Sequence, residues 1–326
     1  MYHRTPAMLA ALLPVVLFGA ATVWAAAPVK LIHDTDIESD VDDVGTVALL
    51  HALADRGEVE LLAMGVSAKF EWCAPCLDAL NTYYGRPDIP IGVVKGPGVR
   101  ANSLYAQKIA EEFPHDLKSA DDAPDAALLY RRVLAGQPDQ SVVIVTVGFL
   151  TNVANLLKTA PDEHSPLGGK ELVAKKVKAW VCMGGKFPRG KEWNVHRDAA
   201  ASKYAIENFP RPIVFSGYEI GSRVKTGAKL RETPKTNPVR RAYELYNGLK
   251  NRESWDQTAA LYAVRGLDGG LAAFWDLKTT GTCHVEPDGT TEWRDAPDKD
   301  HAHLIEKKPP EEVAAAVEAL MVAPPK

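Results

Sequence analysis

The sequence predicts an α/β fold: an open, mostly parallel sheet covered by helices on both faces, followed by a C-terminal β-hairpin and helix. Short apolar runs alternate with longer segments whose apolar residues recur at helical spacing. The run Ser141–Val147 is β-branched and almost unbroken, as in strands buried on both faces of a parallel sheet. The ends of the expected strands are rich in Gly and Asp, and ligands of such sheets bind at the carboxyl ends of strands.

The elements follow in order along the chain. Gly85 and Gly136 each close an expected helix, and Pro287-Asp288-Gly289 is typical of a hairpin turn. We expect strands at 29–33, 60–66, 89–94, 141–147, 177–183, 212–216, 282–285 and 290–294, and helices at 44–54, 75–84, 123–135, 152–158, 198–207, 258–264 and 310–321.

Composition excludes several classes of protein. The 326 residues are 46% hydrophobic, which is too apolar for a disordered chain. There are 38 Lys+Arg and 42 Asp+Glu residues, a net charge of -4, and no basic block, so we expect no nucleic-acid partner. Four cysteines do not make a disulfide scaffold.

The first 27 residues have the pattern of a secretory signal peptide. A short polar start with Arg4 precedes an apolar stretch, and Val23-Trp24-Ala25 fits the small-x-small cleavage rule. The alternative is an uncleaved membrane anchor. We expect cleavage, a single domain over 28–326 with no membrane span, and a periplasmic or secreted location, where calcium is plentiful.

An acidic cluster follows the first expected strand. Six carboxylates within eleven residues repel one another unless a cation or water compensates them. Oxygen ligands at this density favour calcium or magnesium, and the alternative is a solvated loop whose aspartates cap the next helix. An EF-hand loop fails at Ser39 and Gly45, and a haloacid-dehalogenase-type phosphatase motif is broken at Glu38. The acids are Asp34, Asp36, Glu38, Asp40, Asp42 and Asp43.

Four motifs, in order over residues 30–266, resemble those of the inosine–uridine-preferring nucleoside hydrolase family. The acidic segment resembles the family's first signature, with two extra residues before the paired aspartates and without its Pro-Gly. The other motifs occur at later strand ends and at a helix start. All four are Asp34-Thr35-Asp36 with Asp42-Asp43, Gly148-Phe149-Leu150-Thr151-Asn152, Met183-Gly184-Gly185 with Glu192-Trp193-Asn194, and Ser254-Trp255-Asp256.

The resemblance implies a calcium site and a sugar site. The implied metal ligands are Asp36, Asp43, Asp256 and the backbone carbonyl of Thr151. Calcium takes 6–8 oxygen ligands, which leaves positions for water and a sugar diol. Asp36 is also the implied general base, acting on water below the anomeric carbon. Asp34 is expected to support them, and the insertion leaves open whether Asp40 or Asp42 exchanges roles with these acids. The implied substrate-binding residues are Asp42, Met183, Glu192, Asn194 and Trp255.

Two departures bear on the substrate. Many members have a His immediately before the late Asp, as a proton donor to the base, and here Trp255 stands there. The purine-preferring branch also has Trp, so Trp255 favours purine nucleosides; the alternative is core packing at a helix start. The second departure is the loop from Gly185 to Glu192, which is short compared with the family's pattern. The sequence leaves open which group protonates the leaving base.

A thiol motif competes with this interpretation. Glu71-Trp72-Cys73-Ala74-Pro75-Cys76 resembles the redox motif of thioredoxin, and a thiol at a helix N-terminus gains thiolate character. The motif lies inside a longer series of strands and helices, so we expect a disulfide between Cys73 and Cys76 near the pocket mouth, without a redox role.

We therefore expect an exported, calcium-dependent N-glycosyl hydrolase whose partner is a small nucleoside, with a homo-oligomer left open. Two alternatives remain. One is a thiol-disulfide oxidoreductase using Cys73 and Cys76, and the other is a non-catalytic calcium- or sugar-binding protein on the same fold.

Overall fold

A computed structural model describes residues 1–3, 27–267 and 274–326. The predicted signal peptide falls almost entirely on residues 4–26, which lie outside this description. Among the described residues, no helix combines the length and the apolar character needed to cross a bilayer.

The centre of the molecule is an eight-stranded sheet, and the predicted fold class is confirmed. Every neighbouring pair of strands that the description contains in this sheet is parallel, except for the antiparallel pair at one edge, β12 with β15. In spatial order the strands are β12(Trp275–Lys278), β15(His301–Glu306), β9(Ile213–Ser216), β7(Val177–Met183), β6(Val142–Thr146), β1(Val29–Thr35), β2(Val59–Val66) and β4(Ile91–Val93).

The strand order reverses direction between β1 and β6. From β1 the chain adds β2 and β4 on one side, and it then returns to add β6, β7 and β9 on the other. The loops that leave neighbouring strands at such a point diverge, and the resulting crevice at the carboxyl ends is the usual ligand site of open α/β sheets. The acidic segment follows β1 and the Gly148–Asn152 motif follows β6, so both motifs flank this crevice.

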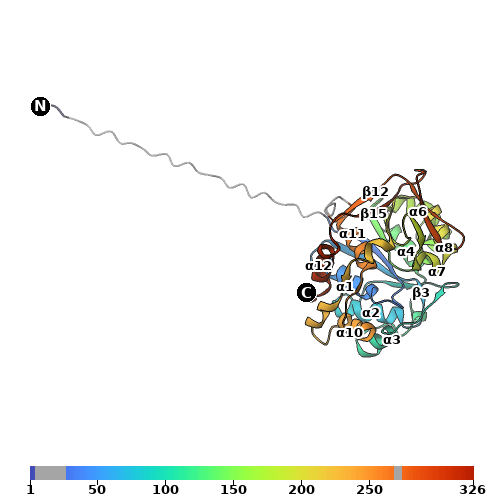
Figure 1. Ribbon diagram of the computed structural model, residues 1–326, viewed down its shortest axis with the longest axis horizontal. Helices are drawn as coiled ribbons and strands as arrows, with labels where there is room; N and C mark the ends of the chain where they lie inside the picture. Colours follow the sequence, from blue (N-terminus) through green and yellow to red (C-terminus); the bar gives the residue numbers. More distant parts are fainter. Residues whose placement is uncertain (4–26, 268–273) are drawn as a thin grey trace.

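Helices cover both faces of the sheet (Figure 1). Side chains alternate along β1, so Leu31 joins one apolar cluster and Ile32 joins the other. One cluster includes residues of α1(Asp42–Asp55), α2(Cys73–Tyr83), α10(Pro238–Asn247), α11(Trp255–Arg265) and α12(Pro310–Met321). The other includes residues of α4(Ala126–Ala135), α5(Thr151–Lys158), α6(Gly169–Lys176) and α8(Ala199–Asn208).

The predicted C-terminal hairpin and helix are present at the predicted residues. The hairpin strands β13(Thr282–Val285) and β14(Thr290–Arg294) lie outside the main sheet. They form a separate small sheet in which β14 pairs with β8(Arg189–Lys191), the strand that precedes the Glu192 motif. The remaining elements are short: β3(Ala68–Lys69), β5(Val99–Arg100), α3(Ala106–Glu112), η1(Ala120–Asp122), β8(Arg189–Lys191), α7(Trp193–Arg197), α9(Tyr218–Gly221), β10(Lys225–Thr226), η2(Ala228–Glu232), β11(Arg252–Glu253), β13(Thr282–Val285) and β14(Thr290–Arg294).

Candidate active site

The acidic segment after β1 is buried rather than solvated. Asp36 is 6% exposed, and Asp42 and Asp43 are each 2% exposed. Asp42 and Asp43 form the first turn of α1, where the partial positive charge of a helix N-terminus favours carboxylates. Capping does not account for them, because no side chain caps this helix. This burial disfavours the interpretation of the cluster as a water-exposed loop.

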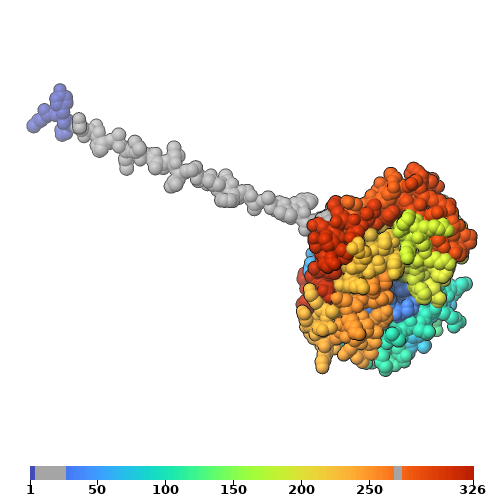
Figure 2. Space-filling model, in the orientation of Figure 1, coloured from blue at the N-terminus to red at the C-terminus, as the bar shows by residue number. Residues whose placement is uncertain are grey.

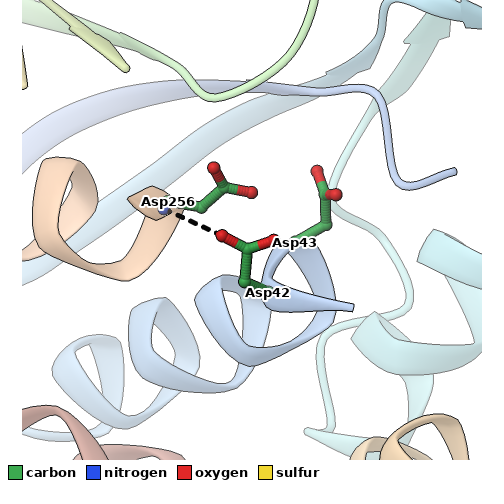
Figure 3. Close-up of side chains that lie close together, drawn as sticks. All are labelled: Asp42, Asp43 and Asp256. Carbon is green, nitrogen blue, oxygen red and sulfur yellow. Dashed lines mark hydrogen bonds between the residues drawn. The ribbon is translucent and has the colours of Figure 1, made fainter. Parts of the chain in front are cut away.

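A third aspartate joins the pair from far along the chain. Asp256 lies in the first turn of α11, and its backbone N–H donates to Asp42 Oδ2 at 3.2 Å. Figure 3 shows the carboxylates of Asp42, Asp43 and Asp256 gathered between the starts of the two helices. One oxygen from each carboxylate lies within 4.8 Å of the other two, a spacing that could hold a metal ion.

Two glycines permit this convergence. A Cβ at Gly45 would lie 2.4 Å from Gln257 Nε2, so the absence of a side chain lets α1 approach α11 closely. A Cβ at Gly148 would lie 2.4 Å from the backbone nitrogen of Asp36, so the turn after β6 can reach the acidic segment. Gly45 is also the residue that breaks the EF-hand pattern, and its place in the fold gives a packing reason for it.

The described part of the chain provides these acids with little compensating positive charge. Burial raises the pKa values of Asp36, Asp42 and Asp256 well above the usual range, and repulsion among the acids raises them further. Burial also raises the pKa of Asp43 to about 7, although hydrogen bonds from the Thr35 hydroxyl and the Ile37 N–H oppose the shift. A bound divalent cation would remove the repulsion and favour the ionised forms.

Asp36 and Thr151 differ in their relation to this triad. Asp36 lines the same cavity, and repulsion from Asp43 helps to raise its pKa, although Asp36 is not among the three mutually close carboxylates. Thr151 is buried at the first position of α5, and its hydroxyl donates to Asp198 Oδ2 at 2.5 Å. Thr151 is not among the residues that line the cavity.

Of the other three acids of the segment, Asp34 and Asp40 have partners within the protein. The guanidinium of Arg252 contacts both carboxylate oxygens of Asp40, at 2.5 to 3.0 Å, so Asp40 already has a cation. Asp34 Oδ2 accepts from the Tyr130 hydroxyl at 2.5 Å and from Asn152 Nδ2 at 2.9 Å. Asp34 therefore ties β1 to α4 and α5, which agrees with the expected supporting role.

The opposite wall of the cavity contains the Glu192 motif. Glu192 is the N-cap of α7, and its carboxylate accepts from the backbone N–H groups of Gly185, Asn194 and Val195 at 2.7 to 3.2 Å. Burial nevertheless raises the pKa of Glu192 to about 7. The amide nitrogen of Asn194 donates to the Val147 carbonyl at 2.9 Å and to Met183 Sδ at 3.3 Å, which fixes the side chain against the end of β6.

Aromatic rings line the remaining side. Trp255 Nε1 donates to the Tyr218 carbonyl at 2.9 Å, and the two rings lie 5.5 Å apart at an angle of 32°. The ring of Trp255 also packs against the apolar core, and the guanidinium of Arg252 lies 5.0 Å from its centroid. Trp255 therefore combines partial core packing with a surface that faces the cavity.

These walls enclose a cavity of about 350 Å³, within the range of small-molecule sites. In Figure 2 the blue early segment is visible in a recess between the yellow-green segment around residue 190, the gold and orange segment around 250, and the turquoise segment. The cavity is lined by Asp36, Ser39, Asp40, Asp42, Asp43, Val147, Met183, Lys191, Glu192, Trp193, Asn194, Tyr218, Tyr246, Arg252, Trp255 and Asp256.

Sequence reasoning missed several of these residues. Tyr218 follows a strand end that was recognised, so its position there was a usable signal. Tyr246 and Arg252 reach the site from α10 and the segment after it, where the sequence shows ordinary helix and turn residues. Lys191 directly precedes the Glu192 motif, but a single lysine beside a motif gives no signal in the sequence.

The structure does not contain the expected disulfide. Cys73 and Cys76 are both free thiols, and both are fully buried in the first turn of α2. Cys73 Sγ donates to the Ile37 carbonyl at 3.4 Å, beneath the acidic loop, and neither cysteine lines the cavity. Burial raises the pKa values of both thiols, which is the opposite of what a reactive thiolate requires.

Known proteins share this architecture. A purine-preferring ribonucleoside hydrolase from Gardnerella vaginalis superposes with a TM-score of 0.67 at 17% identity, covering 90% of this chain and 99% of that one. A plant nucleoside hydrolase gives 0.68 at 18% identity, covering 91% and 100%. These likenesses, at low sequence identity, support the fold alone.

Sequence comparison identifies the family. A pyrimidine-specific ribonucleoside hydrolase, RihA of Klebsiella pneumoniae, is 27% identical over 203 residues, which are 58% of this chain and 61% of that protein. The family model of the inosine-uridine preferring nucleoside hydrolases matches residues 31–319, a span that includes all four motifs. This chain belongs to the inosine-uridine preferring nucleoside hydrolase family.

Proposed function

We propose that the protein hydrolyses the N-glycosidic bond of ribonucleosides, releasing the free base and ribose, and that it depends on calcium and acts after export. One observation carries the proposal most directly. Carboxylates from the starts of α1 and α11, more than 200 residues apart in the chain, meet in one cavity with Asp36 and an aromatic wall. Family membership supports the same activity.

The residues present fit a hard divalent cation. Their donor atoms are carboxylate oxygens, and burial together with repulsion among the acids raises their pKa values. We assign Asp36, Asp43, Asp256 and the Thr151 carbonyl as calcium ligands, with Asp42 directed to the sugar; the close triad supports Asp42 as an alternative ligand. When bound, calcium would supply ligation for the vicinal hydroxyls of ribose and electrostatic stabilisation.

Asp36 is assigned as the general base. In the reaction, a water oxygen forms a bond to C1′ while the C–N bond breaks and its electron pair stays with the base. One water proton passes to Asp36, the leaving base takes up a proton that solvent ultimately supplies, and Asp36 returns its own proton to solvent. The transition state resembles an oxocarbenium ion, so nearby carboxylates stabilise its positive charge. Asn194 is held by Val147 and Met183, which leaves its amide oxygen able to accept from a sugar hydroxyl.

Trp255 is assigned to the base. An indole stacked on a nucleobase contributes about 1–3 kcal/mol, and larger purine rings present more surface for stacking. The partial exposure of Trp255 to the cavity, beside Tyr218, supports a preference for purine nucleosides. The RihA relative is named as pyrimidine-specific and the Gardnerella hydrolase as purine-preferring, so both specificities occur among the similar proteins.

The decisive experiment measures base release from inosine, adenosine, uridine and cytidine, with added calcium and with a chelator. We expect purine release that the chelator abolishes and calcium restores. Binding of calcium without turnover of any of the four substrates would instead support a non-catalytic binding protein. Insulin reduction by the same preparation, lost in Cys73→Ser, would support the oxidoreductase alternative.

Export is tested separately, by expressing the full chain in a bacterium and locating it. We expect the mature protein in the periplasm or medium, with a mass that corresponds to cleavage near Ala25. Recovery of the whole protein in the membrane fraction, at full mass, would contradict cleavage.

A further inference from the structure

The wall beside Glu192 contains a cation that the proposed reaction does not use. Lys191 lines the cavity and immediately precedes Glu192 at the end of β8. Its ammonium group contacts Asp288 Oδ2 at 3.1 Å, but the two side chains are 48% and 60% exposed. An ion pair this exposed is weak and can be exchanged for another anion.

Lys191 belongs to a short basic segment, residues 186–191, which contains three cations in six residues. Lys186 Nζ lies 4.7 Å from the centroid of Tyr218, a residue that also lines the cavity. Arg189 is paired with Glu292 at 3.2 Å. The second cation in the lining, Arg252, is committed to Asp40 through three contacts. Lys191 is therefore the lining cation best placed to meet an anionic ligand.

The geometry of a ribose ring directs its C5′ group toward the wall beside Glu192. The vicinal hydroxyls at C2′ and C3′ are assigned to the aspartates, and the base at C1′ is assigned to Trp255 and Tyr218. The exocyclic C5′ group leaves the ring at C4′, away from both, so the remaining wall of Met183, Glu192 and Asn194 receives it. Lys191 and Trp193 lie at the solvent end of this wall, where Trp193 is 52% exposed, so the cavity opens there.

We propose that Lys191, assisted by Lys186, recognises an anionic group on the 5′ oxygen of the substrate, so that nucleoside 5′-monophosphates are substrates of this site. The inference rests on the proposed function. A phosphate monoester carries about −1.5 to −2 charges at neutral pH and offers three acceptor oxygens, which suits an ammonium at the mouth of the cavity. The products are then the free base and ribose 5-phosphate, with the same bonds broken and formed as for the nucleoside.

The test compares kcat/KM for inosine and inosine 5′-monophosphate, or for uridine and its monophosphate if the protein prefers pyrimidines. We expect the monophosphate to be cleaved at least as well as the nucleoside. In Lys191→Gln the kcat/KM for the monophosphate, divided by that for the nucleoside, should fall about tenfold, because one charge-assisted contact is lost. Lys175→Gln is the matched control, because Lys175 is an exposed lysine beside the amino end of β7.

Inhibition by the products gives a second measurement. Ribose 5-phosphate should inhibit more strongly than ribose, and Lys191→Gln should remove the difference. Raising the salt concentration should also reduce it, because exposed charges are screened. Cleavage of the nucleoside with no cleavage of its monophosphate would overturn this inference and leave the proposed function intact. Cleavage of neither would overturn the proposed function itself.

Discussion

Four acids of the segment after β1 form two pairs, and the surroundings of the two pairs differ. Asp40 is paired with Arg252, and Asp34 is hydrogen-bonded by Tyr130 and Asn152. In the second group, Asp42 and Asp43 are joined by the distant Asp256, and repulsion among the acids adds to burial in raising their pKa values. Burial also raises the pKa of Asp34, to about 6, but its hydrogen bonds oppose the shift. A single aspartate is a structural anchor where neighbouring side chains satisfy its carboxylate. Where three carboxylates converge and the described chain gives them hydrogen bonds but no ion pair, the charge indicates a ligand.

The largest effect is expected from Asp36, which lines the cavity with the converging group of Asp42, Asp43 and Asp256. Asp36→Asn keeps the shape of the side chain and removes the base, so kcat/KM for inosine should fall by about 10² to 10⁴. Asp40→Asn is the matched variant within the same segment and should retain activity within about tenfold, because Asp40 interacts with Arg252. Equal losses in the two variants would remove the distinction between the groups.

Calcium should stabilise the protein by binding to the converging group of Asp42, Asp43 and Asp256. An ion at 100 times its dissociation constant adds about 2.7 kcal/mol to the free energy of unfolding, which is measured as a rise in Tm on adding calcium to chelated protein. Asp256→Asn should abolish this rise, since it removes one of the three converging carboxylates.

Asp40→Asn should keep most of the calcium response and therefore serves as the control. A rise in Tm that persists unchanged in Asp256→Asn would place the calcium elsewhere in the molecule.

The pair between Asp40 and Arg252 should affect stability more than chemistry. Arg252→Gln leaves a half-buried carboxylate without its cation, and we expect a loss of about 1–2 kcal/mol in the free energy of unfolding measured with urea. Replacing both residues, Arg252→Gln with Asp40→Asn, should recover part of this loss. A double variant no more stable than the single one would show that the unpaired charge is not the cause.

The fold and the meeting of the motifs at one site could both be predicted from the sequence because both follow from the pattern of the strands. Strand β6 is so uniformly apolar that it has to be buried on both faces, and the motifs stand at strand ends that a parallel sheet brings to one edge. The predicted strand of residues 177–183 and the last helix of 310–321 agree with β7 and α12 at both ends.

Other features depend on contacts between residues distant in the chain. Strand β15 mixes histidines with apolar residues, so its place beside β9 was not readable from its pattern. The partner of Asp40 lies 212 residues away in Arg252. The Cys73 motif follows a strand and starts a helix, as expected, but its burial beneath the Ile37 carbonyl results from the packing of α2 under the acidic loop.

The smallest effect is expected in the pH dependence of stability, because two sets of groups oppose each other. The folded-state pKa of Asp43, about 7, lies above its unfolded value near 3.8, so the ion-free fold gains stability as pH falls from about 7 toward 4. The buried histidines His33 and His51 have pKa values lowered to about 3 and about 4, so the fold loses stability as pH falls below 6.5.

Bound calcium shifts this balance, because it keeps its own ligand acids ionised, so that only acids outside the metal site, such as Asp34 and Glu192, still oppose the histidines. The Tm of the calcium-bound protein should therefore decrease relative to that of the chelated protein as pH falls from 7.5 to about 5. The gap between the two curves, measured by thermal melts across this range, should be widest near pH 7.5 and should close in Asp256→Asn. A gap that stays constant with pH would mean that calcium binding does not involve the acids with raised pKa values, and would remove the physical basis for separating the two groups.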